Sequence, residues 1–255
     1  IMVRTNTEKG NTLLRIRGEV IPRKKGIDEQ YPKKIGLLRL KSTHLPFVKV
    51  YQNSSKVDSL QIINTSDKIL DITFHNVPGY MELKTIPDKL MPGQKGIIWG
   101  KYDATKSDNW GFNIGRFSIK INGENFRGSS IAYSAKVVED FSQLTAEERK
   151  NAPKVKFDET TYDFGTAKQN SDVTYTFKFK NEGKSDLKIR RIRATCGCTT
   201  VKPEKTVIPP GESSSFKAIF STGGRQGPQR KAIHFISNDP ENSDISLIMK
   251  GTVEK

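Results

Sequence analysis

The side chains best suited to chemistry in this sequence are two cysteines, Cys196 and Cys198, separated by Gly197. Side chains at positions i and i+2 of a β-strand point to the same face, so both sulfurs would lie on one side of a strand. In a fully extended chain the two Cα atoms would be roughly 6.6 Å apart, which is near the upper limit for a disulfide. A bend at Gly197 would shorten that distance.

Three interpretations of the cysteine pair follow from these residues. The thiols are buried and inert, or they form a strained, redox-responsive disulfide, or they bind a soft metal such as Cu(I) or Zn. Zinc normally needs four protein ligands, and the candidate further ligands are His234, Met249 and Met81, which the sequence does not place nearby. Because the chain has only 2 cysteines, it is not a disulfide scaffold, and its stability must come from packing.

Basic and aromatic residues are the candidates for binding a partner. The net charge of +15 is spread along the chain, and no zinc-finger spacing or aromatic RNA-binding motif accompanies it, so we expect no nucleic-acid partner. One local basic cluster contains Lys178, Lys180, Lys184, Lys188, Arg190, Arg191 and Arg193. It is either the solvated face of two neighbouring strands or a binding patch for an anionic lipid, polysaccharide or nucleic acid.

The candidate partner-binding residues are Lys178, Lys180, Arg191 and Arg193 from this cluster, together with Trp110. Trp110 lies in the turn-like segment Asp108-Asn109-Trp110-Gly111, where an exposed aromatic ring could contact carbohydrate or protein. Trp99 lies on an expected strand, where core packing is the default for an aromatic ring.

The sequence lacks the common signatures of catalysis. It has no Gly-x-Ser-x-Gly elbow and no phosphate-binding P-loop, and His44, His75 and His234 are too widely spaced for a metal-ligand motif. No apolar run approaches the roughly 18 residues that a membrane-spanning helix needs. We therefore expect no enzymatic activity, no cofactor and no transmembrane segment.

Alternating strands and polar turns must position these candidates. Three segments, 1–20, 116–138 and 232–253, resemble one another, and each predicts a strand, an Asn-containing turn and a second strand. In the last of them Ile233 and Phe235 alternate with His234. Upstream, 59–77 resembles 175–193, and 88–104 resembles 205–221. No amphipathic helix separates the strands, so the pattern predicts all-β, tandem, antiparallel sandwiches of the immunoglobulin type.

These similarities divide the chain into five parts. They are a closing hairpin of an upstream domain at 1–22, a polar linker at 23–34, a first immunoglobulin-like domain at 35–140, a linker at 141–153, and a second immunoglobulin-like domain at 154–255. The second linker predicts a short helix, with Thr145 as the N-cap and Glu148 completing a capping box.

Several short motifs of the second domain resemble one known family. They are Asp163-Phe164-Gly165, Asn181-Glu182-Gly183, Cys196-Gly197-Cys198-Thr199, Pro210-Gly211-Glu212 and Ser237-Asn238-Asp239. Over residues 154–253 the chain resembles the bacterial domain-of-unknown-function family fifteen-seventy-three, which is related to Hydin-like and pilus-chaperone-like immunoglobulin sandwiches. The first domain has Gly79-Tyr80-Met81-Glu82 where the cysteine motif should fall, so the thiols are not needed for this architecture.

The resemblance implies a fold and a location but no activity. Its relatives include multi-domain envelope proteins of Bacteroidetes-type bacteria, so we expect an extracytoplasmic location, in the periplasm or at the cell surface. The leading hypothesis is a non-catalytic binding or structural module of the envelope, with a protein or a surface glycan as partner. The alternative is soft-metal or thiol-redox handling through Cys196 and Cys198. A third hypothesis, binding of an anionic polymer to the basic surface, predicts affinity that falls steeply with salt.

Overall fold

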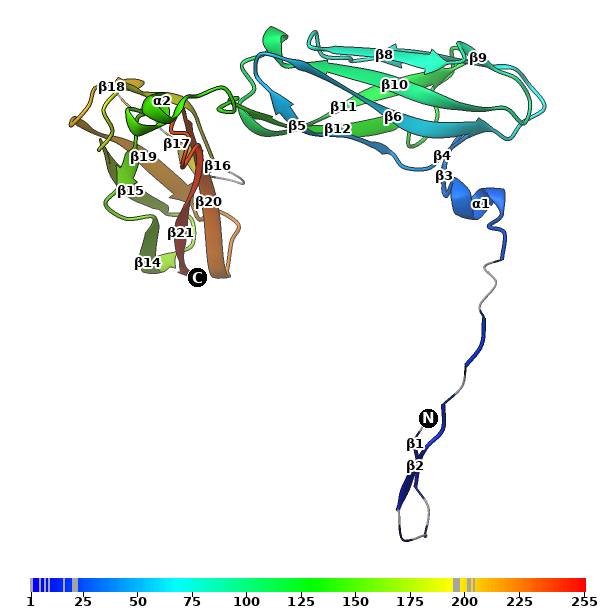
Figure 1. Ribbon diagram of the computed structural model, residues 1–255, viewed down its shortest axis with the longest axis horizontal. Helices are drawn as coiled ribbons and strands as arrows, with labels where there is room; N and C mark the ends of the chain where they lie inside the picture. Colours follow the sequence, from blue (N-terminus) through cyan, green and yellow to red (C-terminus); the bar gives the residue numbers. More distant parts are fainter. Residues whose placement is uncertain are drawn as a thin grey trace.

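A computed structural model describes residues 2–4, 6, 8, 10–15, 17–19, 23–194, 198–200, 203 and 205–255. Within these residues the chain forms two β-sandwiches joined by a short helical linker, preceded by a small hairpin that lies apart from both (Figure 1). The prediction of an all-β protein with immunoglobulin-like sandwiches and a linker helix is confirmed.

Two five-stranded sheets face each other in the first sandwich. One sheet has the order β3 (Lys33–Ile35), β4 (Leu38–Leu40), β6 (Ser55–Asn64), β10 (Lys95–Asp103), β8 (Met81–Ile86). The other has the order β5 (His44–Tyr51), β12 (Ser130–Val138), β11 (Gly111–Ile121), β7 (Leu70–His75), β9 (Lys89–Leu90). A 3-10 helix, η1 (Ala104–Lys106), follows β10.

Alternation along the strands builds the first core. On β10, Ile98 and Tyr102 are fully buried, and Phe117 on β11 is buried opposite them. Trp99 stands between two buried positions and therefore points outward, where the ammonium of Lys84 lies 4.7 Å from its ring centroid. The expectation that Trp99 packs in the core is wrong, because the period of two puts its neighbours, not its own ring, on the inner face.

The second sandwich pairs a four-stranded sheet with a five-stranded one. The four-stranded sheet has the order β13 (Val155–Phe157), β15 (Asp172–Asn181), β19 (Ser213–Ser221), β17 (Cys198–Thr200). The other sheet has the order β14 (Thr161–Lys168), β21 (Asp244–Glu254), β20 (Gly227–Ser237), β16 (Leu187–Ala194), β18 (Val207–Ile208). Between them lies an aromatic core in which the rings of Phe157 and Phe235 meet edge to face at 5.0 Å.

Each sandwich also contains one parallel pair, which the antiparallel prediction lacks. Strand β5 runs parallel to β12, and β14 runs parallel to β21. In the second sandwich the chain first pairs with β15 as β13 and then crosses to the opposite sheet as β14. There the register shifts between Asp163 and Thr166, where Gly165 has a φ of +63° and its N–H donates to Asp163 Oδ1 at 2.9 Å. The Asp-Phe-Gly motif therefore forms a bulge on this edge strand.

The linker helix begins where the capping box places it. Helix α2 spans Ala146–Lys150; Thr145 Oγ1 accepts from the Glu148 N–H at 3.2 Å, and Glu148 Oε2 accepts from the Thr145 N–H at 2.8 Å. A second short helix, α1 (Ile27–Gln30), was not expected and lies in the first linker. The N-terminal hairpin pairs β1 (Met2–Arg4) with β2 (Asn11–Leu13) in antiparallel register.

A buried asparagine holds the same position in each sandwich. Asn64 Nδ2 donates to the carbonyl oxygens of Lys68 and Leu90, at 2.7 and 2.9 Å. Asn181 Nδ2 donates in the same way, at 2.8 Å, to the carbonyls of Ser185 and Ile208. Both side chains are fully buried, so these bonds satisfy groups that would otherwise be costly to bury. The Asn-Glu-Gly motif is therefore a brace of the fold.

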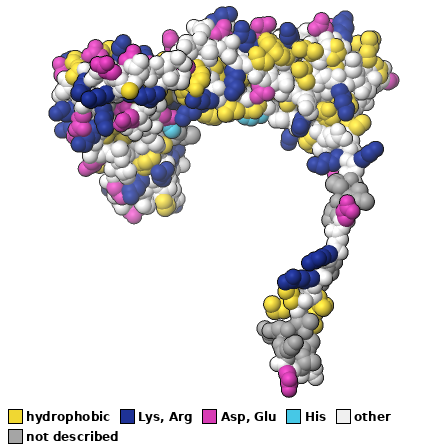
Figure 2. All heavy atoms as spheres, in the orientation of Figure 1, with side chains coloured by type: hydrophobic (Ala, Val, Ile, Leu, Met, Phe, Trp, Pro, Cys, Tyr) yellow, Lys and Arg dark blue, Asp and Glu magenta, His cyan; other side chains and the backbone are white. Residues whose placement is uncertain are grey.

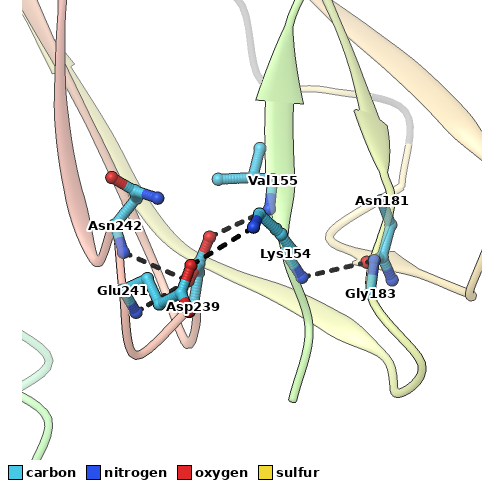
Figure 3. A network of polar contacts seen from close by, with 7 residues as sticks. All are labelled: Lys154, Val155, Asn181, Gly183, Asp239, Glu241 and Asn242. Atoms are coloured by element: carbon cyan, nitrogen blue, oxygen red, sulfur yellow. Dashed lines mark hydrogen bonds and ion pairs between the residues drawn. The ribbon is translucent and has the colours of Figure 1, made fainter. Parts of the chain in front are cut away.

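Asp239 anchors the first strand of the second sandwich (Figure 3). Its buried carboxylate accepts from the N–H groups of Glu241 and Asn242 at 2.9 and 3.1 Å, and from the N–H of Val155 on β13 at 2.9 Å. The Lys154 N–H next to it donates to Asn181 Oδ1 at 3.3 Å. The Ser-Asn-Asp motif thus ties the turn after β20 to the start of the domain, and its carboxylate is fully engaged there.

Candidate functional site: the contact between the two sandwiches

A set of polar contacts joins the two sandwiches, and three arginines of β16 make most of it. In a regular strand, consecutive side chains point to opposite faces. In β16 the register with β20 shifts between Ile189 and Arg191, which inserts Arg190 as an extra residue. This bulge lets Arg190 and Arg191, although adjacent in sequence, both reach the first sandwich.

Arg190 makes the strongest single contact. Its guanidinium donates from Nε and Nη2 to Glu139 Oε2 and Oε1, at 3.0 and 2.8 Å, and lies over the Trp110 ring with Cζ 5.0 Å from the centroid. The two charged side chains are only 29% and 25% exposed, so solvent screens their attraction weakly. A planar two-pronged donor matches a carboxylate in this way, whereas a lysine cannot.

The other two arginines bind main-chain and amide oxygens around the turn before β11. Arg191 Nη1 donates to the Trp110 carbonyl at 3.2 Å and to Asn113 Oδ1 at 3.0 Å. Arg193 Nη1 donates to the Phe112 carbonyl at 2.6 Å. Burial, and then the charge of Arg193, lower the pKa of Arg191, but a guanidinium stays protonated at physiological pH. The bonds to three oxygens offset the cost of placing two cations side by side.

A second ionic contact closes the other side of the interface. Asp244 on β21 accepts from Lys136 Nζ of the first sandwich at 2.8 Å and pairs with His234 Nδ1 at 2.9 Å. Burial acts to raise the pKa of Asp244, but the hydrogen bonds from Lys136 and His234 outweigh it and hold that pKa below its usual value. Asp244 is therefore ionised at neutral pH and binds across the interface.

Close backbone approach completes the contact. Gly111 has a φ of +78°, and a Cβ on it would collide with Cδ1 of Ile236. Ile236 is 7% exposed, because it packs on the neighbouring sandwich. A cavity of about 50 Å³ remains between Gly111, Lys136, Ile236 and Asp244. It can hold ordered water but is far below the few hundred Å³ of a typical substrate pocket. The arrangement fixes two domains against each other; it does not enclose a reactant.

The structure separates the predicted partner-binding residues into two groups. Trp110, Arg191 and Arg193 lie in the interdomain contact and bind within the chain. Lys178 and Lys180 lie on β15, in the other sheet, and are exposed to solvent. Binding of an outside partner therefore stays a prediction. Of the five candidate residues, only Lys178 and Lys180 have charged groups without a partner in the described part of the chain.

Sequence reasoning missed five residues of the interdomain contact. They are Glu139 and Asn113, which the arginines bind, together with Lys136, Asp244 and Gly111, and each is ordinary in its own strand or loop. One signal was available: Asn113 is a polar residue at a buried position of an alternating strand, and such a residue needs a partner.

The cysteine pair lies partly outside the residues that the structure describes. Cys196 lies outside the described residues, and of Cys198 only the backbone, in β17 opposite Phe220, is described. The soft-metal and disulfide interpretations therefore stay untested. Among the residues that the structure does describe, no three His, Cys, Asp or Glu side chains are grouped to hold a metal ion. No helix in that part of the chain has the length and apolar character to cross a membrane.

Comparison with known proteins supports the second sandwich most directly. The segment 155–253 matches the family described as "Protein of unknown function (DUF1573)". Residues 155–253 are therefore similar to DUF1573 domains. The braces at Asn181 and Asp239 described above lie inside this matched segment, and so do the arginines of the interdomain contact. None of the curated proteins matches the chain.

Among solved structures, the fold of both sandwiches together has a counterpart. A protein of unknown function from Porphyromonas gingivalis W83 superposes with a TM-score of 0.61 at 19% identity, covering 85% of this chain and 100% of that one. At that identity the likeness shows the fold alone. The YadV chaperone and a PapD-like domain of human CEP192 give TM-scores of 0.31 and 0.34 at 10% and 8% identity, covering 84% and 46% of this chain and 99% and 96% of theirs; these scores carry no argument about the present chain.

Proposed function

We propose that this chain is a non-catalytic structural and binding module of the bacterial envelope that holds two immunoglobulin-like sandwiches at one fixed angle. The observation that carries the proposal is the interdomain contact of Arg190, whose guanidinium is bound by both oxygens of Glu139 and stacked on Trp110. A bidentate, half-buried ion pair of this kind constrains orientation as well as distance.

Several independent contacts support a fixed angle. Arg191 binds Asn113 on one side of the interface, and Lys136 binds Asp244 on another. Gly111 against Ile236 adds close packing between these two points. Rotation of one sandwich on the other would break at least one of the ionic contacts and leave a partly buried charge without its partner, which is expensive. Domains within one chain often move freely, so such a contact indicates a function for the angle.

The non-catalytic part of the proposal is supported by how the titratable groups are used. Buried Asp239 is occupied by three backbone N–H groups, and half-buried Asp244 by Lys136 and His234. The extracytoplasmic location is supported by the resemblance of the DUF1573-like segment to envelope proteins. Fractionation of the native host, with protease treatment of intact cells, tests the location. If protease digests the chain only after the inner membrane has been breached, the extracytoplasmic location is excluded.

The decisive experiment measures the angle in solution. Small-angle X-ray scattering of the full chain should fit a single arrangement of the two sandwiches. In the double variant Arg190→Ala/Arg191→Ala the radius of gyration should rise and the distance distribution broaden. The matched control, Lys178→Ala/Lys180→Ala, removes the same charge from β15 and should scatter like the wild type. Equal scattering from all three proteins, or a broad distribution in the wild type, would rule the proposal out.

A further inference from the structure

The outer face of the four-stranded sheet carries cations that the fold does not use. Three lysines, Lys178 and Lys180 on β15 and Lys217 on β19, are exposed, and each lies directly across the sheet from a hydroxyl side chain. The three cross-strand pairs are Lys178–Ser215, Lys180–Ser213 and Thr176–Lys217. We call these six residues the lysine face. Figure 2 shows Lys and Arg side chains over the second sandwich, interspersed with Asp and Glu.

None of the three lysines has an ion pair or a side-chain hydrogen bond within the described part of the chain. Two nearby carboxylates are engaged by other lysines: Glu182 by Lys156 and Glu212 by Lys205, each at 3.2 Å. Asp158 is exposed beside Lys178, to whose carbonyl its N–H donates at 3.2 Å, and it offsets part of the charge there. The three lysines still leave an excess of positive charge on this face, which raises the local concentration of anions.

The spacing of the charges suits an extended anionic chain. Residues two apart on a strand lie about 6.8 Å from each other, which separates Lys178 from Lys180. Lys217 is the diagonal neighbour of Lys178 across the sheet, at roughly 7–8 Å. The three lysines therefore follow one another along the outer face of the sheet, and a hydroxyl side chain stands opposite each of them. A polymer with regularly repeated anionic groups and many hydroxyls is complementary to this pattern.

The outward positions of β15 and β19 distinguish between classes of polyanion. They hold no aromatic ring on which a base could stack and no arginine to grip a phosphate with two prongs, both of which favour nucleic acids. None of the exposed large apolar side chains in the described part of the chain lies on these two strands, so insertion into a lipid surface has no anchor. Lysines as point charges and Ser or Thr hydroxyls as donors and acceptors suit a sugar chain.

We propose that the lysine face binds an anionic polysaccharide, carrying carboxylate or sulfate groups. This inference names a partner class for the module proposed above and rests on its exposure outside the cytoplasm. Titration calorimetry of the full chain tests it with three probes, namely polygalacturonate, dextran sulfate and neutral dextran. We expect the two charged polymers to bind, with log K falling linearly with the logarithm of salt concentration, and neutral dextran not to bind. The stronger of the two charged probes identifies the anionic group.

The triple variant Lys178→Ala/Lys180→Ala/Lys217→Ala should bind about tenfold more weakly or worse, because each contact contributes a factor of roughly two to five. Its salt dependence should also be less steep. The matched control, Lys41→Ala/Lys95→Ala/Lys150→Ala, removes three exposed lysines elsewhere and should bind like the wild type.

An equal loss in the control would mean that net charge alone drives binding and would overturn the proposal. So would the absence of binding to either charged polymer, or tighter binding to a single-stranded oligonucleotide or to phosphatidylglycerol vesicles than to both of them. Scattering from the same samples reports the interdomain angle separately. If the interdomain angle is fixed but the lysine face binds no polymer, only the binding proposal fails. If the lysine face binds polysaccharide but the interdomain angle varies, only the proposal of a fixed angle fails.

Discussion

Two stretches of the second sandwich that look alike in sequence serve different purposes. The arginines of β16 face the first sandwich and are bound by Glu139, Asn113 and main-chain oxygens. The lysines of β15 and β19 face solvent and are bound by nothing in the described chain. Only about ten residues separate Lys180 from Arg190 along the chain, yet the two strands lie in opposite sheets.

The difference shows how residue type follows the task. A guanidinium is planar, carries five donors and is weakly hydrated, so it can be half-buried against a carboxylate and an aromatic ring at once. An ammonium is strongly hydrated and flexible, which suits a surface that meets water and mobile ligands. The arginine side therefore contributes to the stability of the folded chain, whereas the lysine side contributes little to it. Substitutions that test this contrast should differ in size accordingly.

The largest effect is expected from Gly111→Val. The residue would have to adopt a φ of +78° and would collide with Ile236 across the interface. Strain and overpacking together should lower the free energy of unfolding by about 3 kcal/mol, measured by urea denaturation of the full chain. In an Ile236→Ala background the clash is relieved, so part of the loss should return and the backbone strain should remain. An unchanged unfolding curve for Gly111→Val would contradict the close approach.

Arg190→Ala should lower the free energy of unfolding by about 2 kcal/mol, because it leaves Glu139 partly buried without its partner. This value lies between those of exposed and buried ion pairs. Differential scanning calorimetry should show the melting of the two sandwiches moving apart as their coupling is lost. Arg190→Lys keeps the charge but not the two-pronged geometry, and it should recover less than half of the loss. Full recovery by lysine would mean that charge alone, without the fork, makes the contact.

Acid should loosen the other side of the interface over a defined range. The pKa of Asp244 is lowered from 3.8, so its contribution to stability is complete above pH 3.8 and is lost as the pH falls through the lower value of the folded state. Scattering should therefore show the interdomain angle unchanged down to about pH 4 and relaxing below it. Asp244→Asn should lose about 1 kcal/mol at neutral pH and remove this part of the acid response. An angle that relaxes near pH 6 would point to a different group.

The sandwiches themselves could be predicted because their signals are local. Ile233 and Phe235 are both fully buried, as the alternation with His234 requires, and Thr145 caps α2 because its hydroxyl and Glu148 are three residues apart. Period and capping act within a few residues of the chain. The parallel pairs β5–β12 and β14–β21 were missed because they join strands from opposite ends of each domain, and no local pattern encodes such a pairing.

The interdomain contact could not be predicted for the same reason. Arg190 and Glu139 are 51 residues apart, and the local sequence around either residue does not indicate that the two are in contact. The sequence placed Trp110 in a loop, as the structure does, but only the tertiary structure brings the Arg190 guanidinium over its ring. The residues of the basic cluster are close in sequence but form two separate groups in space, because the turn between β15 and β16 places these strands in different sheets.

The smallest effect on stability is expected from the lysine face. Lys178→Ala/Lys180→Ala/Lys217→Ala removes three exposed side chains without partners in the described chain and relieves repulsion between like charges, so the free energy of unfolding should change by less than about 0.5 kcal/mol. The triple arginine variant Arg190→Ala/Arg191→Ala/Arg193→Ala changes the net charge equally and should lose several times more, because its groups are half-buried and bound. Both are measured by urea denaturation under the same conditions. A loss of similar size in the two variants would mean that the lysines also hold the fold together, and the contrast between a structural arginine side and a free lysine side would fail.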